Sequence, residues 1–408
     1  MIFNSKASRH TGGLLFYMGI FPKPQVRHYI YQIQMKNYFA GKPILKRLAI
    51  IAVLALAIYL LMLFATHPTA VEKYYSQGLY PVLCFVLHPV FNIFPFSVGD
   101  VVYIGVVAYL IYAVIRLVKL LFRKKFLQAG LLVTGVVIGV QTALLLFYTL
   151  WGLNYFRPSA AERLNLEAPK FTFAQLQTVT AILIDSANAT RARVTPADLQ
   201  QPNDTIYNTA IKAVKQLGTT SPNFKTYSPG IKPSLLTPLL NYIGTSGYYN
   251  PFSTEAQLNY QQPVFVRPFV ACHEMSHQMG YGAEDEANFV GYLAATASKD
   301  RLLRYSAYQL AVREFMFSVY MADSLVNKQL KKRISPQVRA DFKQERLYWQ
   351  KYQNRANVIT GIFYDNFLKA NNQPQGLDTY NQMVNLVMAN TIKQHPRRNW
   401  DRIEGLKD

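Results

Sequence analysis

Residues 126–151 read FLQAGLLVTGVVIGVQTALLLFYTLW and contain no charged side chain. An α-helix needs about 20 predominantly apolar residues to cross the hydrocarbon core of a bilayer. Residues 48–66 form another uncharged run, and residues 98–117 form one that is interrupted only by Asp100 and Arg116. Three runs of this length and composition predict a multi-pass membrane protein with three transmembrane helices.

The composition of the whole chain agrees with this prediction. Of its 408 residues, 50% are hydrophobic and only 16% are charged, whereas soluble domains carry about 25% charged residues. The two cysteines, Cys84 and Cys272, are too few for a disulfide scaffold or a cysteine-rich zinc finger.

The formal net charge of +21 is unevenly distributed along the sequence. Residues 1–47 and 116–125 hold many Lys and Arg residues and no acidic residue. Loops rich in positive charge stay in the cytoplasm, so we expect a basic cytoplasmic segment at 1–47, a membrane domain at 48–151 and an extracytoplasmic domain at 152–408. The basic residues are then topology signals, and a nucleic-acid partner is not expected.

Between the first two runs lies a shorter apolar segment, residues 79–94, which contains Pro81 and Pro89. We expect it to be interfacial or re-entrant and not a fourth span. Cys84 and His88 in this segment lack a third metal-type side chain at helical spacing, so we expect them to pack and not to bind a metal.

The 152–408 region is predicted to be mostly helical with a small sheet, an α+β domain. Apolar residues at helical spacing and Gly stop signals define its predicted helices. These cover residues 173–193, 206–216, 234–242, 268–279, 284–298, 301–331, 336–369 and 380–394. Residues 245–266 are rich in Tyr, Thr, Asn and Gln and predict the sheet.

A metal-binding motif occurs in this region. The sequence Cys272-His-Glu-Met-Ser-His277 contains His-Glu-x-x-His. On a helix the residues i and i+4 share one face, so His273 and His277 can bind one Zn²⁺ ion through their imidazole nitrogens. Glu274 lies about 100° further round the helix, where it can act as general base toward a water on the metal.

A catalytic zinc ion usually has three protein ligands and one open position. Two candidates for the third ligand follow the motif, Glu284 and Glu286. A helix that starts near Glu284 places it on one small, polar face with Ala287, Asn288 and Gly291, whereas Glu286 lies about 200° away. We favour Glu284, with Asn288 holding a ligand histidine by its other ring nitrogen, and Glu286 remains the alternative.

Three stretches carry a resemblance to known proteins. They are Gly247-Tyr-Tyr-Asn-Pro-Phe-Ser-Thr-Glu-Ala256, His273-Glu-Met-Ser-His-Gln-Met-Gly280 and Glu284-Asp-Glu-Ala-Asn-Phe289. His-Glu-x-x-His followed by Glu-x-x-Ala-Asn resembles the gluzincin pattern, although His277 and Glu284 are closer in sequence than in larger gluzincins. Together the stretches resemble an uncharacterised family of bacterial membrane proteins with three N-terminal spans and a zincin-like domain. The resemblance implies a peptidase-like zinc site and no particular substrate.

Peptide hydrolysis needs further parts. An edge strand that pairs with an extended peptide could come from residues 254–260 or 263–266, and plain structural strands are the alternative. An electrophile for the oxyanion could be Tyr364, Tyr380 or His395. A metzincin is excluded, because Ala283 stands where its third histidine would be. Cys272 lies on another helical face from the histidines and is expected to be a buried small side chain.

These observations lead to one main hypothesis. We expect a membrane-anchored zinc metallopeptidase in the bacterial inner membrane, with the lipid bilayer and a protein or peptide substrate as partners. Its site would consist of the metal ligands His273, His277 and Glu284, with Glu274 as the catalytic base. The alternatives are a non-catalytic membrane scaffold or binding protein with a structural zinc ion, and a zinc hydrolase of a cell-envelope amide. An intramembrane protease is disfavoured, because the motif lies far beyond the last span.

Overall fold

The computed structural model describes residues 24–166, 171–376 and 383–395. The chain forms two compact units. Unit 1 consists of Met1–Tyr59 and Tyr109–Leu144, and unit 2 consists of Leu60–Ala108 and Leu145–Asp408. The domain limits predicted from the sequence stay a prediction.

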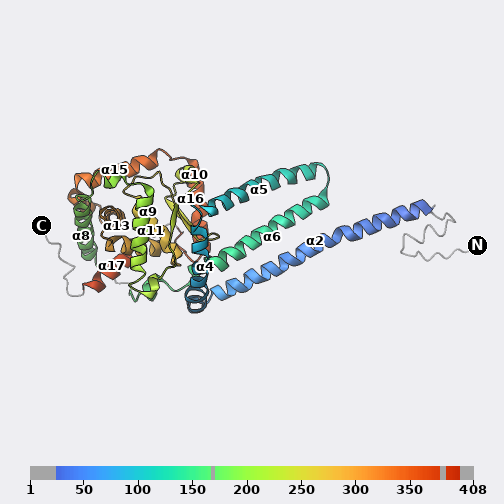
Figure 1. Cartoon of the computed structure of the whole chain (residues 1–408), viewed down its shortest axis with the longest axis horizontal. Coiled ribbons are helices and arrows are strands. Elements are labelled where there is room, and N and C mark those ends of the chain that lie inside the picture. Colours follow the sequence, from blue (N-terminus) through green and yellow to red (C-terminus); the bar gives the residue numbers. More distant parts are fainter. Residues whose placement is uncertain (1–23, 167–170, 377–382, 396–408) are drawn as a thin grey trace, which may run out of the picture. The chain divides into compact units, whose positions relative to one another are not determined.

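Three helices in the described part of the chain are long and apolar enough to cross a membrane. They are α2 (Pro24–Ala65, of which Pro43–Ala65 is the apolar part), α5 (Val98–Phe122) and α6 (Phe126–Leu150). The prediction of three apolar helices is therefore confirmed, although α2 begins well before residue 48. Figure 1 shows the short turn that joins α5 to α6. Within unit 1, the Gln141 side chain donates to the carbonyl of Ile51 at 3.2 Å, a polar contact of the kind that helps helices associate in membranes.

Unit 2 begins with the segment between the first two apolar helices. It contains the short helix α3 (Pro68–Ala70), the π-helix η1 (Val71–Leu79) and α4 (Tyr80–Asn92). With 13 residues, α4 is too short to span a bilayer. Its residues Tyr80, Cys84 and His88 recur every four positions and are buried, while Phe85 and Val86 are exposed. Cys84 and His88 contact the carbonyl groups of Gln278 and Tyr227, so they pack as predicted.

A three-stranded sheet follows in the chain. Its strands are β1 (Ile231–Pro233), β2 (Gly247–Asn250) and β3 (Glu255–Leu258), in the order β1-β3-β2. Strand β3 pairs in parallel with β1 and antiparallel with β2. The predicted sheet is confirmed, but β1 lies outside the predicted range. Of the two segments considered for an edge strand, 254–260 holds the central strand β3, which fits the alternative of a plain structural strand. The other segment, 263–266, forms no strand and leads by a turn into the next helix.

Helices make up most of the rest of unit 2. They are α7 (Ala160–Arg163), α8 (Phe173–Arg191), α9 (Asn203–Leu217), α10 (Thr237–Ile243), α11 (Arg267–Gln278), α12 (Glu284–Ala297), α13 (Arg301–Ala322), α14 (Ser324–Arg333), α15 (Pro336–Gln350), α16 (Arg355–Ala370) and α17 (Met383–Gln394), with 3-10 turns at Gly152–Phe156, Asp198–Gln200 and Pro222–Phe224. Figure 1 shows how they surround α11, which contacts α9, α12, α13 and strand β3.

Two predicted helices are each divided in the structure. The predicted helix 301–331 breaks at Asp323, whose carboxylate accepts from the backbone N–H groups of Leu325 and Val326 and so starts α14. The predicted helix 336–369 ends at Gln350, and Asn354 caps the start of α16. In both cases a side chain that favours the N-cap position begins a new helix. Residues 380–382 of the last predicted helix lie outside the described residues.

An ion pair ties η1 to the chain that leaves α6. Arg157 donates to both carboxylate oxygens of Glu72, at 2.6 and 2.8 Å, and both side chains are largely buried. Burial alone would raise the pKa of Glu72, but the Arg157 guanidinium holds this pKa below its usual value of 4.5. Bidentate pairs of this kind are among the stronger side-chain contacts in proteins.

We predict that Glu72→Gln lowers the free energy of unfolding at pH 7 by about 1.5–3 kcal/mol, the range for hydrogen bonds to charged groups. Because the folded pKa lies below the unfolded one, the pair contributes fully above about pH 4.5, and its contribution disappears as the pH falls through the folded pKa. Denaturant unfolding in detergent, followed by circular dichroism at several pH values, measures the difference.

The control is Asp185→Asn, which removes an exposed pair with Arg333 and should change stability little. A Glu72→Gln deficit of the same size at pH 7 and well below pH 4.5 would contradict the assignment.

Candidate metal centre

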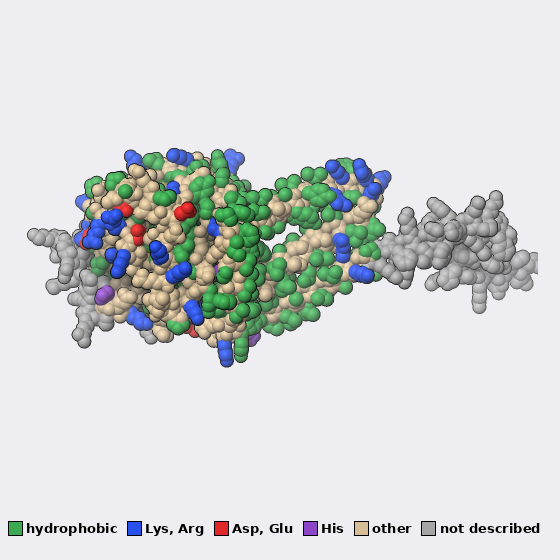
Figure 2. Space-filling view, in the orientation of Figure 1, with side chains coloured by type: hydrophobic (Ala, Val, Ile, Leu, Met, Phe, Trp, Pro, Cys, Tyr) green, Lys and Arg blue, Asp and Glu red, His purple; other side chains and the backbone are tan. Residues whose placement is uncertain are grey.

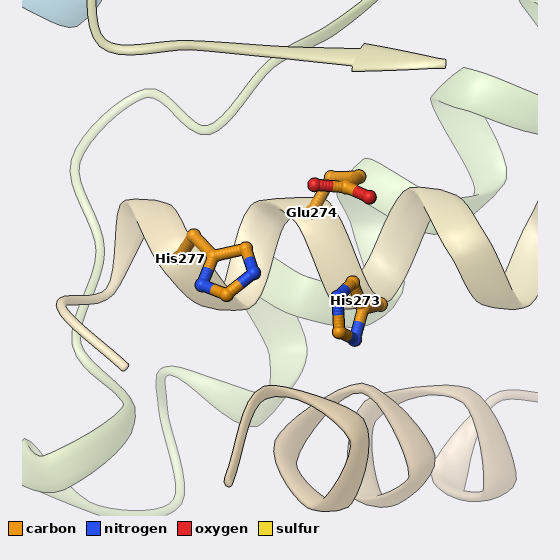
Figure 3. A group of neighbouring side chains, drawn as sticks. All are labelled: His273, Glu274 and His277. Atoms are coloured by element: carbon orange, nitrogen blue, oxygen red, sulfur yellow. The ribbon is translucent and has the colours of Figure 1, made fainter. Parts of the chain in front are cut away.

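His273, Glu274 and His277 are brought together on α11. All three are buried, and their possible ligand atoms lie within 4.8 Å of one another. Figure 3 shows the two imidazoles along one side of the helix and the Glu274 carboxylate on the side nearest a strand. The helix begins at Arg267-Pro268, where a proline is well tolerated. It ends before Gly280, whose φ of +81° favours glycine.

Side chains from earlier parts of unit 2 satisfy the carbonyl groups at the end of α11. The Trp151 indole donates to the His277 carbonyl at 2.9 Å, and the Tyr80 hydroxyl donates to the Gln278 carbonyl at 3.0 Å. Arg157 donates to the Gly280 carbonyl at 3.0 Å. The last carbonyls of a helix have no partner within it, so Trp151 and Tyr80 satisfy two of them, and Arg157 holds the turn that follows the helix.

The turn after α11 returns the chain so that α12 packs directly on the histidine helix. Gly291 makes this approach possible, because a Cβ atom there would lie 3.0 Å from the backbone nitrogen of His273. The packing confirms that the small face of α12 meets α11. Glu284, which lies about two turns before Gly291 on that face, is thereby carried to the histidines.

The Glu284 carboxylate lies next to both imidazoles. Its Oε2 is 3.2 Å from Nε2 of His273 and 3.7 Å from Nε2 of His277. Two metal bonds of about 2.1 Å at a tetrahedral angle would separate ligand atoms by about 3.4 Å. Glu284 Oε2 also has no partner that meets hydrogen-bond geometry among the described residues. Two nitrogens and one carboxylate oxygen thus converge as the donor set of a metal ion would.

Glu286, the alternative third ligand, points elsewhere. It accepts from the backbone N–H of Ala160 at 2.5 Å and from Arg163 at 3.0 Å. The backbone of Ala160 thus occupies Oε1 of Glu286, and the buried ion pair with Arg163 occupies Oε2. Of the two carboxylates that the sequence left open, the structure therefore brings Glu284 to the histidines and not Glu286.

The other ring nitrogens show how the imidazoles are held. Nδ1 of His277 lies 2.6 Å from the carbonyl oxygen of Tyr281, so Nδ1 carries the proton and Nε2 faces Glu284 with a free lone pair when the ring is neutral. Nδ1 of His273 has no partner among the described residues. The expected role of Asn288 was therefore wrong: it lines the cavity beside the site, and a backbone carbonyl takes its predicted place at His277.

The charges of the site perturb one another because all four groups are buried. Burial raises the pKa of Glu274 to about 7, although the two histidines oppose this. Burial alone would lower the pKa of His277, but the Glu284 carboxylate raises it to about 9. Burial would raise the pKa of Glu284, but the two histidines hold it well below its usual range. The Glu284 carboxylate and the His277 imidazole thus favour each other's charged form.

A cavity of about 1130 Å³ opens onto these residues. Strand β2, at one edge of the sheet, lines it together with α10, α13 and α16. Its aromatic wall contains Tyr103, Phe147, Trp151, Tyr155, Tyr248, Tyr249, Phe252, Phe269, Phe363, Tyr364 and Phe367. The edge strand expected beside the site is therefore β2 and neither of the two predicted segments.

Of the three downstream residues considered for the oxyanion, only Tyr364 is seen at the site. Its hydroxyl donates to Oε1 of Glu284, and its side chain lines the cavity. His395 follows α17 and is not among the cavity residues, and Tyr380 lies outside the described residues. Cys272 is fully buried, as expected, and burial raises the pKa of its thiol far above the usual range.

The sequence did not reveal several residues that position the site. The end of α11 is held by Tyr80, Trp151 and Arg157. Gly247 lies against the Glu274 carboxylate, because a Cβ atom at position 247 would be 2.7 Å from Oε1 of Glu274. Tyr80 and Trp151 are 198 and 126 positions from the carbonyls they bind, so no local pattern connects them. The stretch around Gly247 carried the family resemblance, which was the only signal for its importance.

We predict opposite effects for two helical glycines. In a helix, alanine is more favourable than glycine by about 1 kcal/mol. Gly291→Ala would nevertheless force α12 away from α11, so it should lower the free energy of unfolding by about 1–3 kcal/mol. Gly361→Ala on α16 is the matched control, since a Cβ there meets no described atom within 4 Å. Thermal unfolding in detergent compares them, and equal melting temperatures for the two variants would contradict the close packing.

The comparisons with known proteins identify a family and no activity. Residues 75–388 match the family described as "Protein of unknown function (DUF3810)". No curated protein and no solved structure matches the chain. The matched range covers most of the chain and includes α4, α5, α6 and all the residues of the metal centre. The chain belongs to the DUF3810 family of proteins of unknown function.

Proposed function

We propose that this protein is a membrane-anchored zinc metallopeptidase. The observation that carries the proposal is the convergence of Nε2 of His273, Nε2 of His277 and Oε2 of Glu284, with the Glu274 carboxylate beside them. Two imidazoles and one carboxylate, with room for a further ligand, are the donor set of catalytic zinc. A structural site would need a fourth protein ligand and would have no use for Glu274.

Each side chain has a role in the proposed site. His273, His277 and Glu284 would hold the metal, with the Tyr281 carbonyl and the Tyr364 hydroxyl orienting His277 and Glu284. When bound, zinc supplies a Lewis acid that polarises a carbonyl oxygen and makes water a stronger nucleophile at neutral pH. The donor set resembles that of gluzincins, which supports zinc over metals that prefer all-oxygen sites.

Glu274 would move the proton. It would accept a proton from the attacking water and later donate it to the leaving amine. Burial raises its pKa to about 7, and a general acid–base group works best when its pKa lies near the working pH. Its carboxylate adjoins Gly247 on β2, so a peptide chain bound along β2 would pass directly by the base.

The peptide would bind by adding a strand to the sheet. Strand β2 pairs with β3 on one side only and borders the cavity on the other. An extended peptide can pair with such an edge through its main chain, while the aromatic cavity accepts its side chains. This mode favours an unfolded or flexible segment of protein as the substrate.

The membrane topology is part of the proposal. The basic segments at 1–47 and 116–125 support a cytoplasmic N-terminus, which would place unit 2 on the outer side of a bacterial inner membrane. The catalytic domain would then act on extracytoplasmic parts of proteins.

Metal analysis of the purified protein tests the proposal first. We predict one zinc ion per chain in the wild type, its loss in Glu284→Ala, and its retention in Glu286→Ala. Elemental analysis measures the content. Because Glu286→Ala breaks the pair with Arg163, Glu286→Gln serves as a second control that preserves part of that contact.

Hydrolysis is measured next on a peptide library in detergent. Glu274→Gln should retain zinc and reduce the rate by about 10²–10⁴-fold, the usual contribution of a general acid–base group. A folded wild-type protein without zinc would refute the proposal. One zinc ion with no peptide hydrolysis would favour a structural site or a hydrolase of a cell-envelope amide.

A further inference from the structure

Helices α10 and α16 expose an unusually apolar surface. They pack side by side, and Asn354 at the start of α16 donates to the carbonyl of Tyr242 on α10 at 2.9 Å. The large apolar side chains on their outer side are 49–73% exposed. They are Leu235, just before α10, and Leu239, Tyr242, Val358, Ile359, Ile362 and Phe363 on the two helices, here named the α10–α16 face.

Charge is scarce on this face. α10 carries no charged residue, and α16 carries Arg355 at its first position and an Asp365–Lys369 pair near its end. Contiguous apolar patches on a surface mark protein or membrane contacts. The neighbouring structure indicates which of these applies.

One side of the α10–α16 face adjoins the start of α5. The Asp100 carboxylate, in the first turn of α5, accepts from the backbone N–H of Leu235 at 2.6 Å and from the Ser234 hydroxyl at 3.0 Å. Leu235 therefore lies level with the first turn of a helix that is apolar enough to cross a membrane. Val101 and Val102 in that same turn are themselves exposed apolar residues.

The other side adjoins the end of α6. The rings of Phe147 on α6 and Phe367 on α16 meet edge to face, with centroids 6.0 Å apart. Within unit 2, α5 thus contacts Leu235 of the face, and α6 contacts α16, the helix that carries much of the face. A bilayer that surrounds α5 and α6 has its surface at these ends. Figure 2 shows hydrophobic side chains gathering along this border of unit 2, over the region where Figure 1 places α4 and α16.

The same two helices form a wall of the cavity. Asn357, Thr360, Gly361 and Tyr364 line it from α16, and Ile243 lines it from α10. Val358, Ile359 and Ile362 lie between these cavity residues along α16 and are exposed, as expected for a helix that separates two environments. Phe363 is exposed and also lines the cavity. Tyr103 of α5 and Phe147 of α6 complete the wall, so the cavity reaches the apolar helices themselves.

We propose that the α10–α16 face rests in the headgroup and acyl boundary of the lipid bilayer, and that the cavity therefore takes polypeptides that are anchored in that membrane. The first part stands on the apolar face and its continuity with α5 and α6. The second part rests on the proposed peptidase function. Tyr242 and Tyr352, whose rings meet at 5.5 Å, suit this boundary because aromatic residues concentrate there.

Nitroxide labels on the full-length protein in phosphatidylcholine–phosphatidylglycerol vesicles test the membrane contact. Single cysteines replace Leu239, Ile359 or Ile362, and Lys328→Cys on α14 is the matched control at an exposed polar site. Cys84 and Cys272 are buried, so the wild type measures background labelling. The readout is the collision rate of each label with oxygen, which concentrates in lipid, and with a water-soluble nickel chelate.

We expect the ratio of oxygen to nickel collisions to be several-fold higher at the three face positions than at Lys328→Cys. Equal ratios at all four positions would place the face in water and overturn the proposal. Labels shielded from both reagents would show a second copy or another protein on the face, which would also overturn it. Neither the metal nor catalysis enters this measurement, so it is decided independently of the proposed function.

Cleavage of a tethered probe tests the substrate class. One quenched-fluorescent peptide library is used free in solution and fused to a transmembrane leucine–alanine helix in the same vesicles. Ile359→Glu and Ile362→Glu should lose several-fold of their rate on the tethered library and keep the wild-type rate on the free one, with Lys328→Glu unchanged on both. Equal losses on both libraries, or a wild type that prefers the free library, would overturn the inference about the substrate. Failure of the wild type on both libraries would instead refute the peptidase function, and the substrate class with it.

Discussion

The carbonyl groups at the end of α11 are the point on which the site depends. A helix end that is buried in a domain must find donors for its last carbonyls, and here Trp151, Tyr80 and Arg157 provide them. Two of these donors come from α4 and from the residue that follows α6. The position of the histidines is therefore set by the same segments that join the apolar helices to unit 2. These segments and the candidate metal centre are thus linked by hydrogen bonds from side chains to main-chain carbonyls.

Burial of charge is the second constraint. Two imidazoles and two carboxylates lie in the interior of unit 2, where an isolated charge would be costly. The groups compensate one another, since Glu284 stabilises a positive His277 and burial favours a protonated Glu274. The cation that we propose would meet ligand atoms that already lie close together, with Oε2 of Glu284 at 3.2 Å and 3.7 Å from the two Nε2 atoms.

Much of this could be predicted from sequence because the signals were local. The three apolar helices followed from their length and lack of charge, and the helix of His273 and His277 followed from their spacing. Glu284 could be preferred because the face it shares with Gly291 is small, and that face indeed packs on α11. Glu286 could be set aside only by the structure, since its partner Arg163 is 123 positions away. The helix breaks at Asp323 and Asn354 were missed because apolar residues at helical spacing continue across both caps. The edge of the sheet was misplaced because β1 pairs with β3 across a long interval of sequence.

The most direct test of this account is X-ray absorption spectroscopy at the zinc edge of the purified full-length protein. The account predicts a four- or five-coordinate ion with nitrogen and oxygen neighbours near 2.0–2.2 Å, the outer-shell scattering of two imidazoles, and no sulfur. A sulfur neighbour near 2.3 Å would show that Cys272 or Cys84 binds the metal and that the site has been assigned wrongly. The scattering of only one imidazole would likewise contradict a centre formed by His273, His277 and Glu284.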